Sequence, residues 1–345
     1  MKILKKQIAI IGAGAMGTAL AVLISKNKKG RVKLWDRDAE VIKKIEKTRK
    51  NIGFLGPEIK IPKDVFPCFD LRKTIEGTDL ILLAVPSFAI REVCKKIYNL
   101  GHQKKFNNKK LAPILMVSKG LEKETSLLPF QIVEEILEKK DILHLTWSGF
   151  AQEITGENKR TEILASRNKD LAKKFKNLFE TDWLKISISS DLVGVQLGGA
   201  LKNVAVIGIG LADKGDQKIK NKLIRESVRE MIILGEKMGA EKETFEGPAG
   251  KVNLELSSDS RSRNYRWGKA LFEKSVEEVQ KDLKRKLVTL EGLNTTWGVH
   301  QLVKKYRLKL PIIDEVYKVI YKKKNPKKSA IKLIKLVENK RTSLI

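Results

Sequence analysis

Three glycines near the start of the chain have the spacing of a loop that holds phosphate groups. Gly12, Gly14 and Gly17 form a G-x-G-x-x-G sequence directly after the apolar run at 7–11. In such a loop the first glycine makes a tight turn, the second lets the backbone approach a pyrophosphate, and the third lets the next helix pack closely. The free amides at the start of that helix attract negative charge. The segment predicts a dinucleotide-binding site, and the alternative is a glycine-rich turn without a ligand.

An acidic residue lies at the distance expected for a ribose contact. Asp36 comes 19 residues after Gly17 and follows the next apolar run, at 32–35. A carboxylate in this place can bind the two ribose hydroxyls of NAD. The adjacent Arg37 could instead accept the 2′-phosphate of NADP. The cofactor is therefore NAD or NADP, with NAD slightly favoured by Asp36.

A single lysine interrupts a long apolar segment in the second half of the chain. Lys202 lies within the glycine-containing apolar stretch 194–212, and on a helix Gln196 and Asn203 would share one face beside it. A lysine in such a place is costly unless it faces a cavity or a charge partner. Burial lowers its pKa from about 10.4, as a base that works near neutral pH requires. The alternative is a surface lysine whose ammonium reaches water.

The elements that must position these groups change in type near residue 190. Before it, strand and helix patterns alternate, which predicts a parallel sheet with helices on both sides. The expected strands are near 7–11, 31–36, 65–69, 79–84, 112–117 and 143–147, with a further pair at 161–165 and 183–188. The expected helices are near 15–26, 38–49, 71–76, 87–98 and 124–139.

After residue 190 the patterns are helical. Apolar residues recur at helical spacing in the segments 221–238, 268–287, 292–305, 312–322 and 328–338. The fold class is thus α/β, a Rossmann-type doubly wound parallel sheet followed by a mostly α-helical second domain. We expect a dinucleotide-binding domain over 1–189 and a helical substrate and catalytic domain over 190–345.

Six stretches in order resemble the NAD(P)-dependent glycerol-3-phosphate dehydrogenase family. They are 12–21, 83–87, 118–122, 194–204, 262–264 and 291–295. The most specific of them is L-G-G-A-L-K-N, which ends in Lys202 and Asn203. The resemblance covers nearly the whole chain and implies an oxidoreductase that interconverts sn-glycerol 3-phosphate and dihydroxyacetone phosphate. It also implies a role in supplying glycerophospholipid synthesis.

The resemblance carries over residue by residue. It makes Lys202 the proton acceptor and donor, with Lys119 and Asn253 as the other catalytic positions. The implied cofactor contacts are Gly12, Gly14, Ala15, Met16, Gly17, Asp36, Arg37, Lys119, Ala151, Arg263 and Glu291. The implied substrate contacts are Lys119, Gly149, Lys202, Asn253, Ser262, Arg263 and Asn264. A guanidinium and an amide such as Arg263 and Asn264 suit a phosphate group.

Two departures from the family pattern leave other functions open. Asn253 takes the place of an aspartate, if one residue is deleted after it, and an amide cannot supply the negative charge that would partner Lys202. The stretch 148–150 is two residues shorter than the family's S-G-P-[ST]-F-A and lacks its hydroxyl residue. The alternatives are a related two-domain dehydrogenase for another hydroxy acid or phosphate, and a non-catalytic dinucleotide-binding protein.

Composition narrows the partners and the compartment. The chain has 70 basic and 41 acidic residues and a net charge of +29, which suits an anionic substrate or a nucleic acid. The lysines are dispersed and no arginine-rich arm is present, so a solvated surface is favoured over nucleic-acid binding. Cys68 and Cys94 form no disulfide or metal motif, which is typical of the cytoplasm. We expect a cytoplasmic homodimer without a membrane span or a bound metal.

Overall fold

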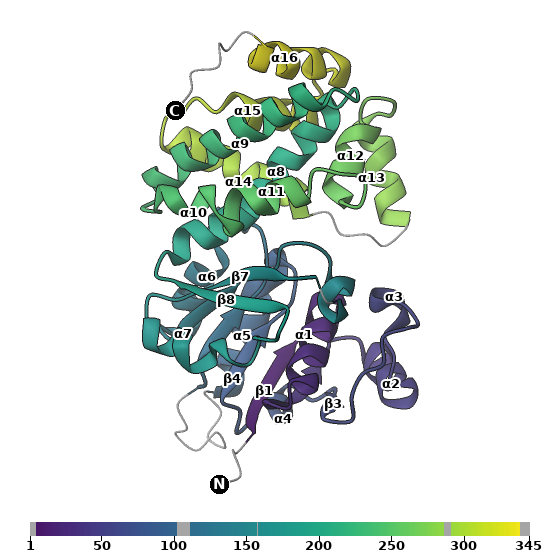
Figure 1. Ribbon diagram of the computed structural model, residues 1–345, viewed down its shortest axis with the longest axis vertical. Helices are drawn as coiled ribbons and strands as arrows, with labels where there is room; N and C mark the ends of the chain where they lie inside the picture. The colour runs from purple at the N-terminus through teal and green to yellow at the C-terminus, as the bar shows by residue number, and fades with distance from the viewer. Residues whose placement is uncertain (1–4, 102–110, 157, 286–290, 339–345) are drawn as a thin grey trace. The chain divides into compact units, whose positions relative to one another are not determined.

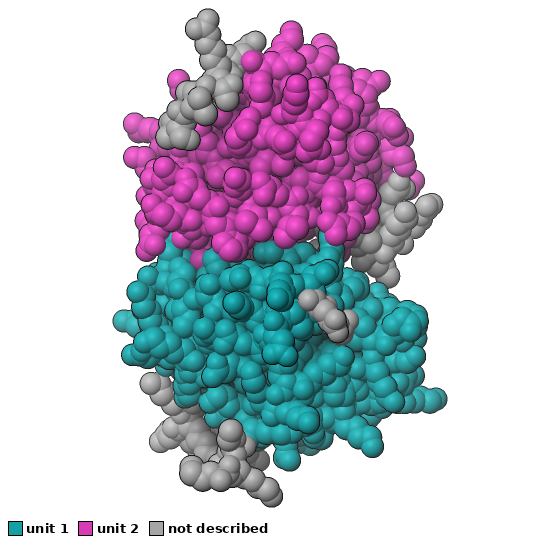
Figure 2. All heavy atoms as spheres, in the orientation of Figure 1, with its two compact units in different colours: residues 1–118, 129–192 teal, residues 119–128, 193–345 magenta. Residues whose placement is uncertain are grey.

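The computed structural model describes residues 5–101, 111–156, 158–285 and 291–338. The chain forms two compact units, drawn in teal and magenta in Figure 2. The first contains 1–118 and 129–192, and the second contains 119–128 and 193–345. The sequence suggested a single boundary between residues 189 and 190. The short segment 119–128 instead belongs with the second unit, which brings Lys119 into the same unit as Lys202.

The first unit is built on one sheet of eight strands in the order β3-β2-β1-β4-β5-β6-β7-β8. Every neighbouring pair is parallel except β6 and β7, which are antiparallel. The order of the first six strands is that of doubly wound dinucleotide-binding sheets, which confirms the expected fold class. The strands are β1 (Lys6–Ile11), β2 (Gly30–Trp35), β3 (Val65–Cys68), β4 (Leu80–Leu83), β5 (Ile114–Met116), β6 (Ile142–Leu145), β7 (Arg160–Ala165) and β8 (Leu184–Ser189).

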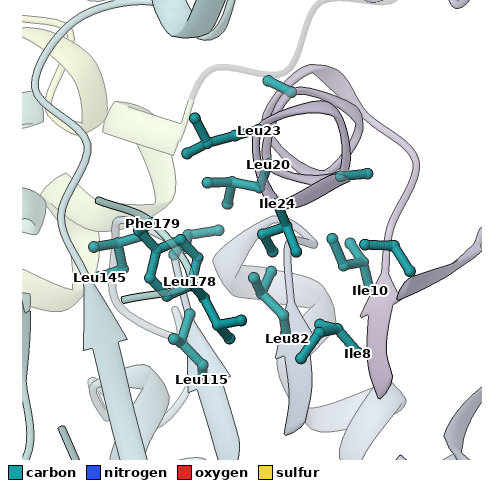
Figure 3. Close-up of a cluster of buried hydrophobic side chains, with 14 of the residues drawn as sticks. Ile8, Ile10, Leu20, Leu23, Ile24, Leu82, Leu115, Leu145, Leu178 and Phe179 are labelled. Atoms are coloured by element: carbon teal, nitrogen blue, oxygen red, sulfur yellow. The ribbon is translucent and has the colours of Figure 1, made fainter. Parts of the chain in front are cut away.

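The central strands are apolar, except for His144 of β6, because helices cover both faces of the sheet. All residues of β4, β5 and β6 are buried, as expected for parallel strands that have no solvent face. Figure 3 shows Leu20 and Ile24 of helix α1 lying over Ile10 and Leu82 of the sheet. This core fixes the carboxyl ends of β1 and β4, where the glycine loop lies.

The helices of the first unit follow the expected alternation (Figure 1). They are α1 (Ala15–Lys26), α2 (Ala39–Thr48), α3 (Ile52–Leu55), α4 (Leu71–Ile75), α5 (Ile90–Gly101), α6 (Pro129–Leu137) and α7 (Lys169–Lys176), with 3₁₀ turns η1 (Ser87–Ala89) and η2 (Ala151–Thr155). The helix expected over 124–139 begins only at Pro129. Proline suits the first turn because it lacks an N–H and has a helical φ.

Apart from the segment 119–128, the described part of the second unit is mostly helical. Its elements are α8 (Leu192–Ala212), α9 (Gln217–Lys237), α10 (Lys242–Glu246), a π turn η3 (Pro248–Val252), α11 (Asn253–Leu256), α12 (Arg263–Ala270), α13 (Val276–Arg285), α14 (Glu291–Lys305), α15 (Pro311–Tyr321) and α16 (Pro326–Glu338). Among the described residues, α8 alone is long and apolar enough to cross a membrane, and 94% of its most apolar stretch is buried in the protein. A core helix has this character, because it meets apolar partners all round.

The single helix expected over 268–287 is wrong, since α12 and α13 are separate there. Ser275 ends the break with a reciprocal cap: its hydroxyl accepts from the Glu278 amide at 3.2 Å, and its own amide donates to the Glu278 carboxylate at 2.7 Å. This is the capping box that S-x-x-E encodes. Residues 286 and 287 lie outside the described part of the chain.

Candidate active site

The glycine loop of the first unit has the close contacts that its sequence predicts. Gly12 follows β1 with φ +110°, a conformation that disfavours other residues. A β-carbon at Gly12 would lie 2.8 Å from the Ala84 carbonyl oxygen, and one at Gly17 would collide with the Gly12 carbonyl oxygen. Gly14 is the N-cap of α1 and has no side chain to cover the amides of Ala15 and Met16. The loop therefore leaves the start of α1 open to a phosphate.

Side chains distant in sequence brace this loop. Asp36 accepts a hydrogen bond from the Ala13 amide at 2.7 Å and one from the Asp38 amide at 3.0 Å. The Asn51 amide group donates to the Ala13 carbonyl and to the Thr18 hydroxyl, both at 2.8 Å. Asp36 thus has a structural bond in addition to the ribose contact expected of it. The contribution of Asn51 was missed, because nothing local in the sequence connects it to the glycines.

The shortened loop after β6 is held by one buried and two part-buried charged groups. Glu162 is fully buried on β7 and accepts hydrogen bonds from the amide and hydroxyl of Ser148, at 2.6 and 3.2 Å. Arg160 donates to the Ser148 carbonyl at 2.7 Å and pairs with the Glu153 carboxylate at 2.9 Å. Gly149 has φ +113° in the turn between them. The loop is therefore tightly specified although it is two residues shorter than the family pattern.

The segment after this turn lies beside the glycine loop's helix. Ala151 is buried and begins η2, which contacts α1 within the first unit. Arg37 directly follows Asp36 after the end of β2 and is exposed. The expected cofactor residues of the first unit are thus gathered at the carboxyl ends of β1, β2 and β6, where ligands of doubly wound sheets bind.

The second unit buries Lys202 beside polar and charged groups. The side chain is on α8 and the residue is 9% exposed. Burial holds the pKa of Lys202 well below its usual value, and the positive charges of Lys119 and Arg263 lower it further, while Glu291 opposes them. Its ammonium group donates to the Ser257 hydroxyl at 2.8 Å. A lysine held by a hydroxyl and flanked by cations readily loses its proton.

Two adjacent glycines let other segments approach this lysine. A β-carbon at Gly198 would lie 2.6 Å from the Ala249 carbonyl oxygen, so only glycine lets α8 meet the π turn η3. The Lys119 side chain lies over Gly199, where a β-carbon would be 3.4 Å from its Cγ. The paired glycines therefore bring Lys119 on one side, and the segment that leads to Asn253 on the other, close to α8.

Asn253 lies one helical turn before the partner of Lys202. It begins α11 and is 1% exposed, and its backbone carbonyl accepts from the Ser257 amide at 3.2 Å. Residues four apart on a helix have β-carbons about 5–6 Å apart on one face. Within the described residues the side-chain oxygen of Asn253 has no hydrogen-bond partner. Asn253 is thus one helical turn from the residue that binds the Lys202 ammonium group.

The expected phosphate residues lie at the start of α12. Ser262 is its N-cap, and Arg263 follows with an exposed side chain. The Asn264 amide group donates to the Asn203 side chain at 2.9 Å, which ties α12 to the residue after Lys202. A β-carbon at Gly292 would lie 2.6 Å from the Asn264 side-chain oxygen, so the start of α14, with Glu291, also reaches this place.

Three buried polar atoms on the described segments around Lys202 have no hydrogen-bond partner. In the described part of the chain, the side-chain oxygens of Asn253, Asn264 and Thr295 are buried and lack hydrogen-bond partners. Buried polar groups nearly always have partners, so a polar ligand or water is expected there. Sequence reasoning missed Ser257 and gave no role to Thr295, although Thr295 was within a matching motif. No cluster of metal-binding side chains occurs among the described residues.

Comparisons with known proteins agree over both units. Residues 7–172 match the family described as NAD-dependent glycerol-3-phosphate dehydrogenase N-terminus, and residues 191–331 match its C-terminus. A protein of Maridesulfovibrio salexigens named glycerol-3-phosphate dehydrogenase [NAD(P)+] is 36% identical over 326 residues, 93% of this chain and 95% of that one. A Bacillus pumilus protein of the same name is 33% identical over 327 residues, 92% and 91% of the two chains. The crystal structure of glycerol-3-phosphate dehydrogenase from Coxiella burnetii has a TM-score of 0.86 at 29% identity and covers 96% of this chain and 99% of that one.

Proposed function

Because the chain belongs to the NAD-dependent glycerol-3-phosphate dehydrogenase family, we propose that it interconverts sn-glycerol 3-phosphate and dihydroxyacetone phosphate with NAD or NADP. The observation that carries the proposal is the buried Lys202, whose pKa is held low among polar atoms that lack partners. Such a lysine is a general base in one direction and a general acid in the other.

Lys202 moves the proton of the reaction. In oxidation, the neutral amine takes the proton of the substrate's secondary hydroxyl, while the carbon that bears this hydroxyl loses a hydride and becomes a carbonyl. A nicotinamide cofactor held at the glycine loop would supply the hydride acceptor for oxidation and the hydride donor for reduction. In reduction, the ammonium form gives the proton back to the oxygen. The Ser257 hydroxyl, 2.8 Å from the nitrogen, orients the lysine in both directions.

The remaining residues hold the substrate and the cofactor. The cations Lys119 and Arg263 would attract the phosphate, and Ser262 and Asn264 add neutral groups at the start of α12. Asn253 would contact the substrate as a neutral group rather than as a charge partner of the lysine. On the first unit, the glycine loop with Ala15 and Met16, and the residues Asp36, Arg37, Gly149 and Ala151, would hold the cofactor and the reacting end of the substrate. Glu291 would lie toward the adenosine.

The test is a spectrophotometric assay of NADH and NADPH oxidation with dihydroxyacetone phosphate. We expect turnover in the wild type and a loss of about 10²–10⁴ in Lys202→Ala, with cofactor affinity unchanged. The control is Lys237→Ala, which removes an exposed lysine of α9 and should keep full activity. If Lys202→Ala retained more than half of the activity, the assignment would be wrong. Turnover only with another hydroxy acid or phosphate would favour the related-dehydrogenase alternative.

The wider biological setting follows from this activity. Production of sn-glycerol 3-phosphate would supply glycerophospholipid synthesis in the cytoplasm, and depletion of the enzyme should be rescued by added glycerol 3-phosphate. We also propose a homodimer. Light scattering should then give about twice the chain mass of 39.0 kDa, and a single-chain mass would refute it.

A further inference from the structure

A cavity lies where α14 ends and α15 begins. Its volume is about 330 Å³, which is in the range of small-molecule sites. The polar residues of its wall are His300, Lys304, Arg307, Lys309 and Asp314, and apolar side chains form the rest. Lys304 is 13 residues after Glu291 on the same helix, about 20 Å away at the rise of an α-helix. The cavity is therefore separate from the pocket around Lys202.

The wall of this cavity carries an excess of positive charge. Lys304, Arg307 and Lys309 are exposed, and none of the ion pairs between described residues joins them to a carboxylate. The one carboxylate of the wall, Asp314, is engaged by Lys318. A guanidinium offers two parallel donors to phosphate oxygens, and the two ammonium groups add charge beside it. The excess suits a dianion.

His300 gives the cavity a buried polar group. The residue is 8% exposed, and its ring stacks on Tyr317 with 3.5 Å between ring centroids and 9° between planes. Burial is the main cause that lowers the pKa of His300, and the positive charge of Lys304 lowers this pKa further. Among the described residues, its Nδ1 atom has no hydrogen-bond partner. The stacked ring is thus fixed in place at the wall of the cavity, where a bound anion would change its surroundings.

The turn that supplies the central cation is the C-terminal cap of α14. Arg307 has φ +54°, the left-handed conformation in which helices commonly end. The Leu308 amide donates to the Val303 carbonyl at 3.0 Å and closes this Schellman cap. The cap fixes the backbone of Arg307 in the wall of the cavity.

We propose that this cavity binds a small phosphate monoester, with the phosphate on Lys304, Arg307 and Lys309 and an apolar remainder against Leu308 and Leu310. Neither the glycine loop nor the Lys202 pocket contributes to it. The site therefore adds a binding function that does not depend on the proposed reaction.

The chain's histidine content allows a direct test. It contains only three histidines, so labelled imidazoles give few NMR signals, and a His300→Gln variant identifies the one of interest. Phenyl phosphate is the probe. We expect a saturable shift of the His300 signal at one equivalent per chain. Arg307→Gln with Lys309→Gln should weaken the affinity at least tenfold, since each lost charged hydrogen bond counts for about that factor.

Matched controls separate the outcomes. Lys335→Gln removes an exposed lysine of α16, and Arg263→Gln weakens the pocket around Lys202, so both should leave the His300 titration unchanged. Benzoate, with a single negative charge, should bind more weakly than phenyl phosphate. The proposal is overturned if the His300 signal does not move, moves linearly without saturation, or responds equally in the Arg307 and Lys309 double variant. Equal affinity for benzoate would refute the choice of phosphate.

Discussion

Restoring a carboxylate at position 253 tests the electrostatics of the candidate site. In the structure Lys202 has a hydroxyl, not a charge, as its hydrogen-bond partner, and Asn253 lies one turn from that hydroxyl. Asn253→Asp would add a negative charge one helical turn from the residue whose hydroxyl binds the lysine nitrogen. At an effective dielectric constant of about 20, two opposite charges about 5 Å apart attract each other by about 3 kcal/mol. That energy corresponds to a rise of about two pH units in the pKa of Lys202.

The rise has a definite effect on reduction of dihydroxyacetone phosphate. Lys202 must be protonated to donate its proton, and burial now favours its neutral form. A higher pKa increases the protonated fraction near neutral pH, while the ammonium becomes a weaker acid. The weaker acidity cancels about half of the two-unit gain in protonation, on a logarithmic scale. We therefore expect the rate of reduction at pH 7 to rise about tenfold.

The assay is the pH profile of kcat/KM for both proteins between pH 5 and 10. The limb assigned to Lys202 should move to higher pH in Asn253→Asp. Asn221→Asp, which adds the same charge on the exposed part of α9, should leave the profile unchanged. A lower rate with the expected shift would mean that the site is tuned to a neutral lysine. An unchanged profile and rate would refute the placement of Asn253 beside the lysine.

Substitutions at four positions probe other contacts. Lys202→Met should stabilise the fold at pH 6, because the pKa of Lys202 is depressed in the folded state and wild-type stability therefore rises with pH between that pKa and about 10.4. The gain in the free energy of unfolding, measured with urea, should shrink over this pH range. A gain that does not depend on pH would contradict the prediction. Ser257→Ala should lower kcat about tenfold by removing the acceptor at 2.8 Å, and Ser257→Thr should retain the rate. Asp36→Ala should weaken NADH more than NADPH in a fluorescence titration, whereas equal weakening would show that its bond to Ala13 is its main role. Glu162→Ala should lower the free energy of unfolding by about 2–4 kcal/mol, since it leaves the buried Ser148 amide unpartnered, and a loss below about 1 kcal/mol would argue against that bond.

Local patterns sufficed for most of the fold. The apolar runs that become β4 and β5 predicted buried parallel strands, and the glycine spacing predicted the turn between β1 and α1. The broken helix at 271–275 also had a local signal, the S-x-x-E capping box, which was overlooked in favour of helical periodicity. The assignment of 119–128 to the second unit had no such local signal, because it depends on packing between segments that are distant in the sequence.

The site was predictable only where a motif named its residues. Lys202, Asn253 and Asn264 belong to recognisable stretches, and the structure gathers them in the second unit. Ser257 is 55 residues from Lys202, and neither its type nor its neighbours distinguish it from other serines. Glu162 was missed for a similar reason. From the sequence it resembles a solvent-facing polar residue of a strand, and only the antiparallel pairing of β6 and β7 brings it close to Ser148.

Among the described residues, the hydrogen-bond partner of Lys202 is a hydroxyl, not a carboxylate, and this gives the substrate a part in setting the lysine's charge. Among the groups that act on its pKa, burial, Lys119 and Arg263 all favour the neutral amine, and Glu291 alone opposes them. A phosphate dianion bound by Lys119 and Arg263 would neutralise those two cations. It would thereby remove the repulsion that lowers the pKa of Lys202 and increase the population of the ammonium form. In the proposed reaction, the anionic substrate itself would supply much of the charge that the family's aspartate provides, which reconciles Asn253 with proton transfer by Lys202.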